Sequence, residues 1–285
     1  MAFPHRRLHA VNNALILGPF ALPYSLLLLF SVIAISIYVG NRGGRKTAVD
    51  VEPVLWKTLL VGLVVARLAF VWEFRLAYMA SPWSLFDIRD GGWNATAGFI
   101  GAWFFALSLY GRRPALRRPV QAALLTGSIV WLVGTIALSL QPGAGQQDMP
   151  ALGFTSLDKP ATTVQLSSFK GKPTVINLWA TWCPPCVREM PVLQKAQADL
   201  PNVHFVFLNQ GETADKVGTW LRARNLNMRN MLIDETRTAG AAFKQSALPM
   251  TLFFDAQGRL VSTRIGELSA ATLAERLAAA NLKEP

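Results

Sequence analysis

The sequence predicts two domains of different classes, an α-helical transmembrane domain followed by an α/β domain. Three observations lead to this prediction. Apolar runs long enough to span a bilayer fill residues 1–145, a segment rich in Gly, Pro and Gln follows, and strand and helix patterns alternate in residues 146–285. Hydrophobic residues make up 52% of the 285 residues and charged residues only 16%, which excludes a disordered or fibrous chain.

Four apolar stretches approach the roughly 20 residues that a helix needs to cross a hydrocarbon core about 30 Å thick. They lie at residues 14–39, 55–74, 95–110 and 120–140, so the sequence predicts about four transmembrane helices. The first stretch carries no charge, although Pro19 and Pro23 would bend or interrupt its start. A cleaved signal peptide is the alternative there, but the run is longer than a signal core and further spans follow it.

The positive charge of the chain gathers in the apolar half. The net charge is +11, and residues 1–145 hold 13 basic and 5 acidic residues, against 15 and 12 in the remainder. Membrane topology explains this distribution better than nucleic-acid binding does. Short basic loops stay in the cytoplasm, so clusters after the first and third spans predict that both termini face outward. These clusters are Arg42, Arg45 and Lys46, and Arg112, Arg113, Arg117 and Arg118.

Three motifs stand out in the apolar half: LGPFALPY at residues 17–24, GLVVAR at 62–67 and DGGWNATAGFIG at 90–101. Together they resemble the first part of bacterial prolipoprotein diacylglyceryl transferases. The resemblance covers about the first 105 residues and implies a lipid-modifying or bifunctional protein as an alternative function. Thr96 stands where that family has a His, and the family's later spans have no counterpart here, so we expect a truncated relative that serves as an anchor.

Arg67 stands near the middle of the second predicted span. An arginine at that depth is costly in hydrocarbon, so its side chain should face protein, water or a phospholipid headgroup. We expect either a structural ion pair with Glu73, Asp87 or Asp90, or a retained lipid-binding site.

Residues 141–150 lack apolar periodicity and mark the domain boundary. Beyond them, the pattern predicts a strand at 174–178, a helix at 183–198, a strand at 204–209 and a helix at 215–225. A strand pair at 250–255 and 260–264 and a helix at 270–280 complete the chain. This order is typical of a sheet with helices on both faces.

Both cysteines of the chain lie in the run WATWCPPC at residues 179–186, directly after a predicted strand and at the start of a helix. A structural zinc site needs four ligands, and the three histidines lie elsewhere, so we expect no metal and no cofactor besides a redox-active disulfide. Two intervening residues on a first helical turn bring the sulfurs within bonding reach. The helix N-terminus lowers the pKa of a thiol, so Cys183 should attack and Cys186 should resolve the mixed disulfide.

Pro184 and Pro185 separate the two cysteines. Proline is tolerated in a first helical turn, but each one removes a backbone N–H that would stabilise the thiolate. A less stabilised reduced form has a lower reduction potential, so the motif favours a reductant over an oxidant.

Residues 164–191, which contain the WATWCPPC run and end in CVREMP, resemble the thioredoxin-like TlpA/ResA family of membrane-tethered, extracytoplasmic thiol-disulfide oxidoreductases. The resemblance extends over nearly all of residues 148–280. It implies a thioredoxin-like fold, protein disulfides as substrates, a reducing role similar to that in cytochrome c maturation, and a periplasmic location for the C-terminal domain.

The resemblance also implies roles for residues outside the cysteine motif. Glu212 matches the acidic residue that the family places behind its cysteines, and we expect a partly buried carboxyl with a raised pKa that takes the proton from Cys186. Pro249 matches a cis-proline that faces the disulfide, with the backbone of Leu248 pairing with an extended client segment.

The remaining residues around the motif divide into packing and surface positions. Trp179 is expected in the core, whereas Trp182 is expected to line the substrate surface. Arg188 and Glu189 are expected on the solvated face of the helix.

The sequence therefore predicts a membrane-anchored periplasmic enzyme that reduces protein disulfides. Because residues 1–145 contain no cysteine, they cannot relay electrons by thiol exchange, and a separate membrane electron donor is expected. A thiol peroxidase is a further alternative, but that chemistry prefers a proline before the attacking cysteine that the run from Trp179 to Cys183 lacks.

Overall fold

The chain folds into two compact units in a computed structural model, which describes residues 14–17, 20–79, 83, 85, 87, 90–110, 113–140, 148–159, 162–243 and 247–279. The helical unit consists of Tyr24–Gln141 together with Leu268–Arg276, and the sheet unit contains Pro142–Glu267. The predicted boundary at residue 145 and Arg112 lie outside the described residues.

Within its described residues, the helical unit contains three helices that are long and apolar enough to cross a membrane, and a fourth apolar helix that is shorter. A 16-residue helix such as the fourth spans about 24 Å, so the predicted count of four spans is not established. The helices are α1 (Tyr24–Thr47), α2 (Glu52–Glu73), α3 (Arg75–Met79), α4 (Ala95–Tyr110), a 3-10 turn at Pro114–Leu116 and α5 (Arg117–Ser139).

The first predicted span begins ten residues too early. Residues Ala14–Leu17 and Phe20–Pro23 form β1 and β2, an antiparallel pair, and α1 begins only at Tyr24. Pro23 is the residue before the helix, and proline inside a helix removes a hydrogen bond and clashes with the preceding turn. The helix therefore starts after the last proline of the motif.

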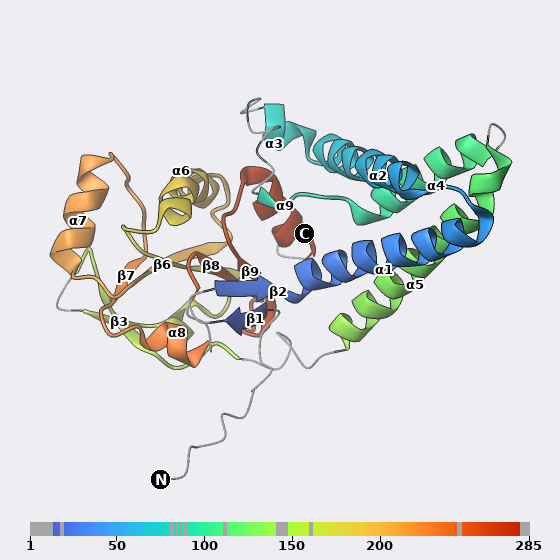
Figure 1. Ribbon diagram of the computed structural model, residues 1–285. Coiled ribbons are helices and arrows are strands. Elements are labelled where there is room, and N and C mark those ends of the chain that lie inside the picture. Colours follow the sequence, from blue (N-terminus) through green and yellow to red (C-terminus); the bar gives the residue numbers. More distant parts are fainter. Residues whose placement is uncertain are drawn as a thin grey trace, which may run out of the picture. The chain divides into compact units, whose positions relative to one another are not determined.

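Helices α1 and α5 pack antiparallel along their length (Figure 1). A Cβ on Gly43, near the end of α1, would lie 3.0 Å from the Cβ of Pro119, near the start of α5. A Cβ on Gly127 would collide with Ser36, so the backbones approach closely at mid-length as well. The basic residues at the end of α1 and the start of α5 consequently lie at the same end of the helical unit.

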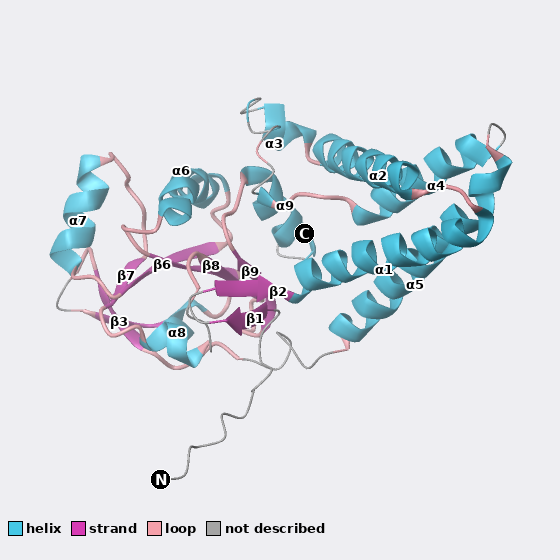
Figure 2. Ribbon diagram, viewed as in Figure 1, coloured by secondary structure: helices cyan, strands magenta, loops and turns pink. Residues whose placement is uncertain are grey.

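The described residues of the sheet unit form a seven-stranded sheet with the order β4-β3-β7-β6-β5-β8-β9. Figure 2 shows strands of this sheet in magenta. Strands β5, β6 and β7 are parallel, and β8 and β9 run antiparallel to them. The strands are β3 (Gly153–Ser156), β4 (Thr163–Gln165), β5 (Thr174–Trp179), β6 (His204–Gln210), β7 (Met231–Asp234), β8 (Met250–Phe254) and β9 (Leu260–Ile265).

Helices cover both faces of this sheet, as predicted. In Figure 1, α6 (Pro184–Asp199) and α7 (Ala214–Ala223) lie on one face and α8 (Thr238–Ala242) on the other. A 3-10 turn at Leu166–Phe169 precedes β5, and α9 (Ala270–Ala279) follows β9. Ile176 and Leu178 point into the core on the α8 face, which leaves Asn177 and Trp179 on the face of α6 and α7. This alternation places polar groups directly beneath the cysteine helix.

Candidate active site

The two cysteines lie at the start of α6, which follows β5. They are joined by a disulfide with an S–S distance of 2.06 Å and a Cα–Cα distance of 5.3 Å. Cys183 is the N-cap of α6, and its Sγ accepts a hydrogen bond from the backbone N–H of Cys186 at 3.3 Å. Both residues are buried, but Cys183 retains 3% of its surface and Cys186 none. Cys183 is therefore the slightly more exposed residue of the pair, which agrees with the attacking role predicted for it.

Pro184 and Pro185 occupy the first two positions of α6, as the sequence predicted. Neither has an N–H, so the amide of Cys186 is the first donor that the helix offers to the Cys183 sulfur. A thiolate at Cys183 thus receives less backbone stabilisation than a helix start without prolines would give.

The start of β8 lies beside the end of β5, because Met250 pairs with Leu178 in the antiparallel register. The Leu248–Pro249 peptide bond that precedes β8 is cis, as predicted. Trp182, next to Cys183, is 57% exposed. The predicted substrate residues therefore flank the same edge of the sheet as the cysteines.

Glu212 does not have the raised pKa that we expected. Burial raises the pKa of its carboxyl, but hydrogen bonds from Lys216, Thr181 and Asn209 outweigh burial and hold the pKa below the ordinary value. The Thr181 amide and hydroxyl donate to the two carboxylate oxygens at 2.7 and 2.6 Å. Lys216 Nζ lies 2.8 Å from Oε1. Glu212 thus anchors the loop that leads into the cysteine motif, and its low pKa makes it a weak base.

Glu189 lies in the core and not on the solvated face, where the sequence analysis placed it. It is fully buried, one helical turn after Cys186 on the same inward face of α6. Asn177 Nδ2 donates to Glu189 Oε1 at 2.8 Å and to the Thr251 hydroxyl at 3.0 Å. Glu189 is therefore a buried carboxyl three residues after Cys186 on the same face of α6, and it is a candidate site residue that the sequence analysis missed.

Arg188, the neighbour of Glu189, is on the exposed face, as predicted. It is not simply solvated, because its guanidinium pairs with the carboxylate of Glu267 at 2.6 Å.

Arg67 makes the structural ion pair that was one of its two expected roles. It is 9% exposed, and its Nη1 donates to Asp90 Oδ1 at 3.0 Å and to the Gly92 carbonyl at 2.9 Å. Its Nη2 donates to the carbonyl oxygens of Leu85 and Asp87, both at 3.1 Å. Protein groups take up the donors that a lipid phosphate would need, so the lipid-binding alternative has no support from this geometry.

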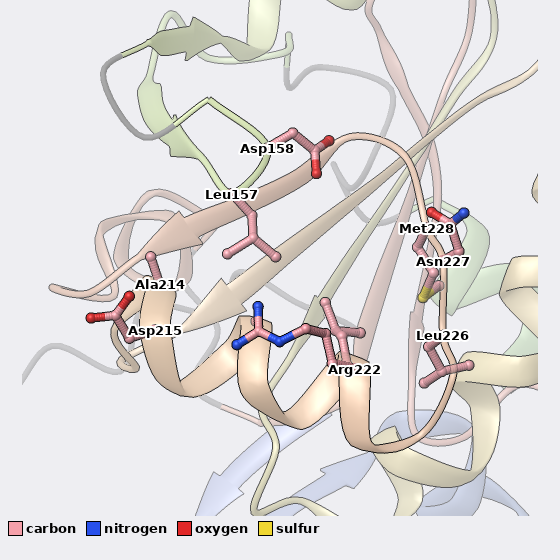
Figure 3. Close-up of a pocket in the computed structure, with 10 residues that line it drawn as sticks. Leu157, Asp158, Ala214, Asp215, Arg222, Leu226, Asn227 and Met228 are labelled. Carbon is pink, nitrogen blue, oxygen red and sulfur yellow. The ribbon is translucent and has the colours of Figure 1, made fainter.

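Two hollows in the described part of the chain are lined by other residues. A space of about 300 Å³ borders α7 and contains Leu157, Asp158, Asp215 and Arg222 in its wall, as Figure 3 shows. A larger apolar groove of about 730 Å³ lies between α4 and α5, and Thr96 is among its lining residues. Neither wall includes the cysteines.

In comparison with known proteins, residues 144–279 match the Redoxin family model. The thiol-disulfide oxidoreductase ResA of Bacillus subtilis is 29% identical over 121 residues, which are 42% of this chain and 67% of that protein. The thiol:disulfide interchange protein DsbE of Vibrio cholerae is 28% identical over 130 residues, which are 46% of this chain and 70% of that protein.

A solved structure of similar sequence is that of a secreted Mycobacterium tuberculosis disulfide oxidoreductase homologous to E. coli DsbE. It is 27% identical, with a TM-score of 0.40, and the alignment covers 45% of this chain and 96% of that one.

Proposed function

We propose that this chain, a thiol-disulfide oxidoreductase, is a membrane-anchored enzyme that reduces disulfides in proteins outside the cytoplasmic membrane. The observation that carries the proposal is the Cys183–Cys186 disulfide at the start of α6, next to the exposed Trp182. Among possible clients, the resemblance to reductants of cytochrome c maturation favours apocytochromes.

Reduction of a client proceeds in two exchanges. The Cys183 thiolate attacks one sulfur of the client disulfide, forms a mixed disulfide and releases the first client thiolate. The Cys186 thiolate then attacks the Cys183 sulfur, which restores the Cys183–Cys186 disulfide and releases the second client thiolate. The client gains two electrons and two protons, and the enzyme loses them. A separate membrane electron donor must reduce the pair again, since residues 1–145 contain no cysteine.

The resolving step needs a base near Cys186, which is fully buried. Glu189 has the position for this role, because it lies on the same buried face of α6 and is bonded to Asn177. Glu212 has the role of holding Thr181, and through it the loop before Cys183, in place. We therefore move the proposed proton transfer from Glu212 to Glu189.

The helical unit anchors the enzyme with its catalytic half outside. The basic residues of α1 and α5 share one end of that unit, which the positive-inside rule places in the cytoplasm. Helix α5 starts at that end and runs to Ser139, so the chain leaves the helical unit on the opposite side. A reporter active only outside the cytoplasm and fused after Pro285 should be active. A reporter active only in the cytoplasm, fused at the same place, should be silent, and the reverse pattern would refute the proposed location.

Trapping of clients tests the function itself. A Cys186→Ala variant cannot resolve the mixed disulfide, so it should accumulate covalent complexes with extracytoplasmic proteins through Cys183. The matched control is the Cys183→Ala, Cys186→Ala double variant, which keeps the surface but lacks the attacking sulfur. Reduction-sensitive complexes that form equally with the control, or none with the single variant, would overturn the proposal.

A further inference from the structure

An ion pair joins the cysteine helix to the loop that follows β9. Arg188 Nε donates to both carboxylate oxygens of Glu267 at 2.9 and 3.1 Å, and its Nη2 donates to Oε2 at 2.6 Å. A guanidinium that meets both oxygens of a carboxylate is held in one orientation, unlike one with a single contact. The pair therefore fixes the position of a cation two residues beyond Cys186.

The backbone next to Glu267 contacts the proline loop. Gly266 has a φ of 99° and its N–H donates to the carbonyl oxygen of Pro249 at 2.9 Å. The segment that carries Glu267 is thus tied to the residue before β8, which lies beside the end of β5. Arg188, Glu267 and Pro249 consequently lie along one rim of the proposed client site.

Arg188 retains donors for a ligand. Its side chain is 40% exposed, whereas that of Glu267 is 15% exposed, so the cation is the member of the pair that faces solvent. Its hydrogen bonds to described residues use Nε and Nη2, which leaves the Nη1 group available. A second arginine, Arg264, donates to the carbonyl oxygen of Glu267 at 3.5 Å. The side chains of Arg188, Glu267 and Arg264 together carry a net charge of +1.

We propose that Arg188 recognises an Asp or Glu side chain close to the client cysteine, with Glu267 holding the guanidinium in position. The inference rests on the proposed function and adds to it the class of client, a protein disulfide with an acidic neighbour. A preoriented cation loses little conformational freedom on binding, which favours a net gain from the contact. Exposed ion pairs contribute up to about 1 kcal/mol, which corresponds to a preference of about fivefold.

The test compares three disulfide-bonded peptides that differ only in the residue beside the attacked cysteine, which is Asp, Asn or Lys. The full-length reduced protein in detergent should reduce the Asp peptide with a kcat/KM about fivefold above that of the Lys peptide, and the Asn peptide should lie between them. The difference should appear in KM and shrink at high salt. Arg188→Gln should make the three peptides equal, and Arg188→Glu should reverse their order.

The control is Lys195→Gln, which removes one positive charge from the exposed face of the same helix, where Lys195 pairs with Asp199. This variant should show the same order of kcat/KM for the three peptides as the wild-type protein. Equal kcat/KM values for all three peptides with the wild-type protein would refute the proposed role of Arg188 but not the proposed function. The same holds if Arg188→Glu leaves the order of the three kcat/KM values unchanged. Failure of the wild-type protein to reduce any peptide would instead refute the proposed function.

Discussion

Each unit of the molecule buries a cluster of polar side chains, and the two clusters differ in how completely their atoms are bonded. In the helical unit, Arg67 donates to Asp90 and to three backbone carbonyl groups. In the sheet unit, Glu189 and Asn177 are bonded to each other, but Asn177 Oδ1, Trp179 Nε1 and Asn209 Oδ1 have no partner among the described residues. The saturated cluster suits a structural role, whereas the cluster beneath the cysteines contains Glu189, the carboxyl to which we assign the proton transfer.

The largest effect should come from the cysteines, which belong to the sheet unit alone. Cys183→Ala should abolish disulfide reduction, because no other thiol besides Cys186 exists in the chain. The helical unit should be unaffected, so extraction into detergent and the helical circular dichroism signal should match those of the wild-type protein. Residual turnover with a protein disulfide would contradict the assignment of the attacking sulfur.

Replacement of Arg67 should damage stability and spare the redox chemistry. Arg67→Leu leaves the Asp90 carboxylate buried without its main partner, a change that typically costs about 3–5 kcal/mol. Thermal unfolding in detergent should show this loss, and Arg67→Leu combined with Asp90→Asn should recover part of it. The midpoint potential of the cysteine pair should stay at its wild-type value in both variants. A changed midpoint potential would contradict a purely structural role for the Arg67 cluster.

Replacement of Glu189 should slow the redox chemistry and spare stability, the opposite of the effect of replacing Arg67. Gln keeps an acceptor for Asn177 Nδ2 but cannot take a proton. Glu189→Gln should therefore slow the resolving step by about a hundredfold at neutral pH, which is the low end of the range for loss of a general acid–base group. Stopped-flow measurement of mixed-disulfide decay should show the slower resolving step. Asp199→Asn, on the same helix, is the control and should leave the decay rate unchanged.

Replacement of Glu212 should have the smallest effect, confined to stability. Its pKa in the folded state lies below the ordinary value of 4.5, so the charged form stabilises the fold above that pH, and the contribution disappears as the pH falls through the folded pKa. Glu212→Gln should lower the free energy of unfolding by about 1–2 kcal/mol at pH 7, and less below pH 4.5. The exposed Glu235→Gln is the control for urea titrations at both pH values. An equal loss at all pH values would contradict the charge-based account.

In residues 146–285, the sequence predicted the elements that have strong periodicity. Strands β5, β6, β8 and β9 and helices α6, α7 and α9 lie within one or two residues of the predicted bounds. Strands β3, β4 and β7 and helix α8 were not predicted, because three to five residues are too few to show a period.

Glu189 was wrongly predicted to be exposed because its side chain is charged. Helical spacing alone would have placed it on the buried face of α6. The buried face of α6 consists of Cys186, Glu189, Met190, Leu193 and Gln197, which recur every three or four residues. The contacts of Arg188 and Glu212, in contrast, join residues 79 and 31 positions apart, and no local pattern predicts them.

The midpoint potential of the Cys183–Cys186 pair tests the central claim most directly. Equilibration of the full-length protein with glutathione or dithiothreitol buffers, followed by alkylation and mass measurement, gives its value. A reductant with a weakly stabilised Cys183 thiolate should have a potential between about −270 and −200 mV. A value near about −120 mV, as strong oxidants have, would contradict the proposed direction of electron flow.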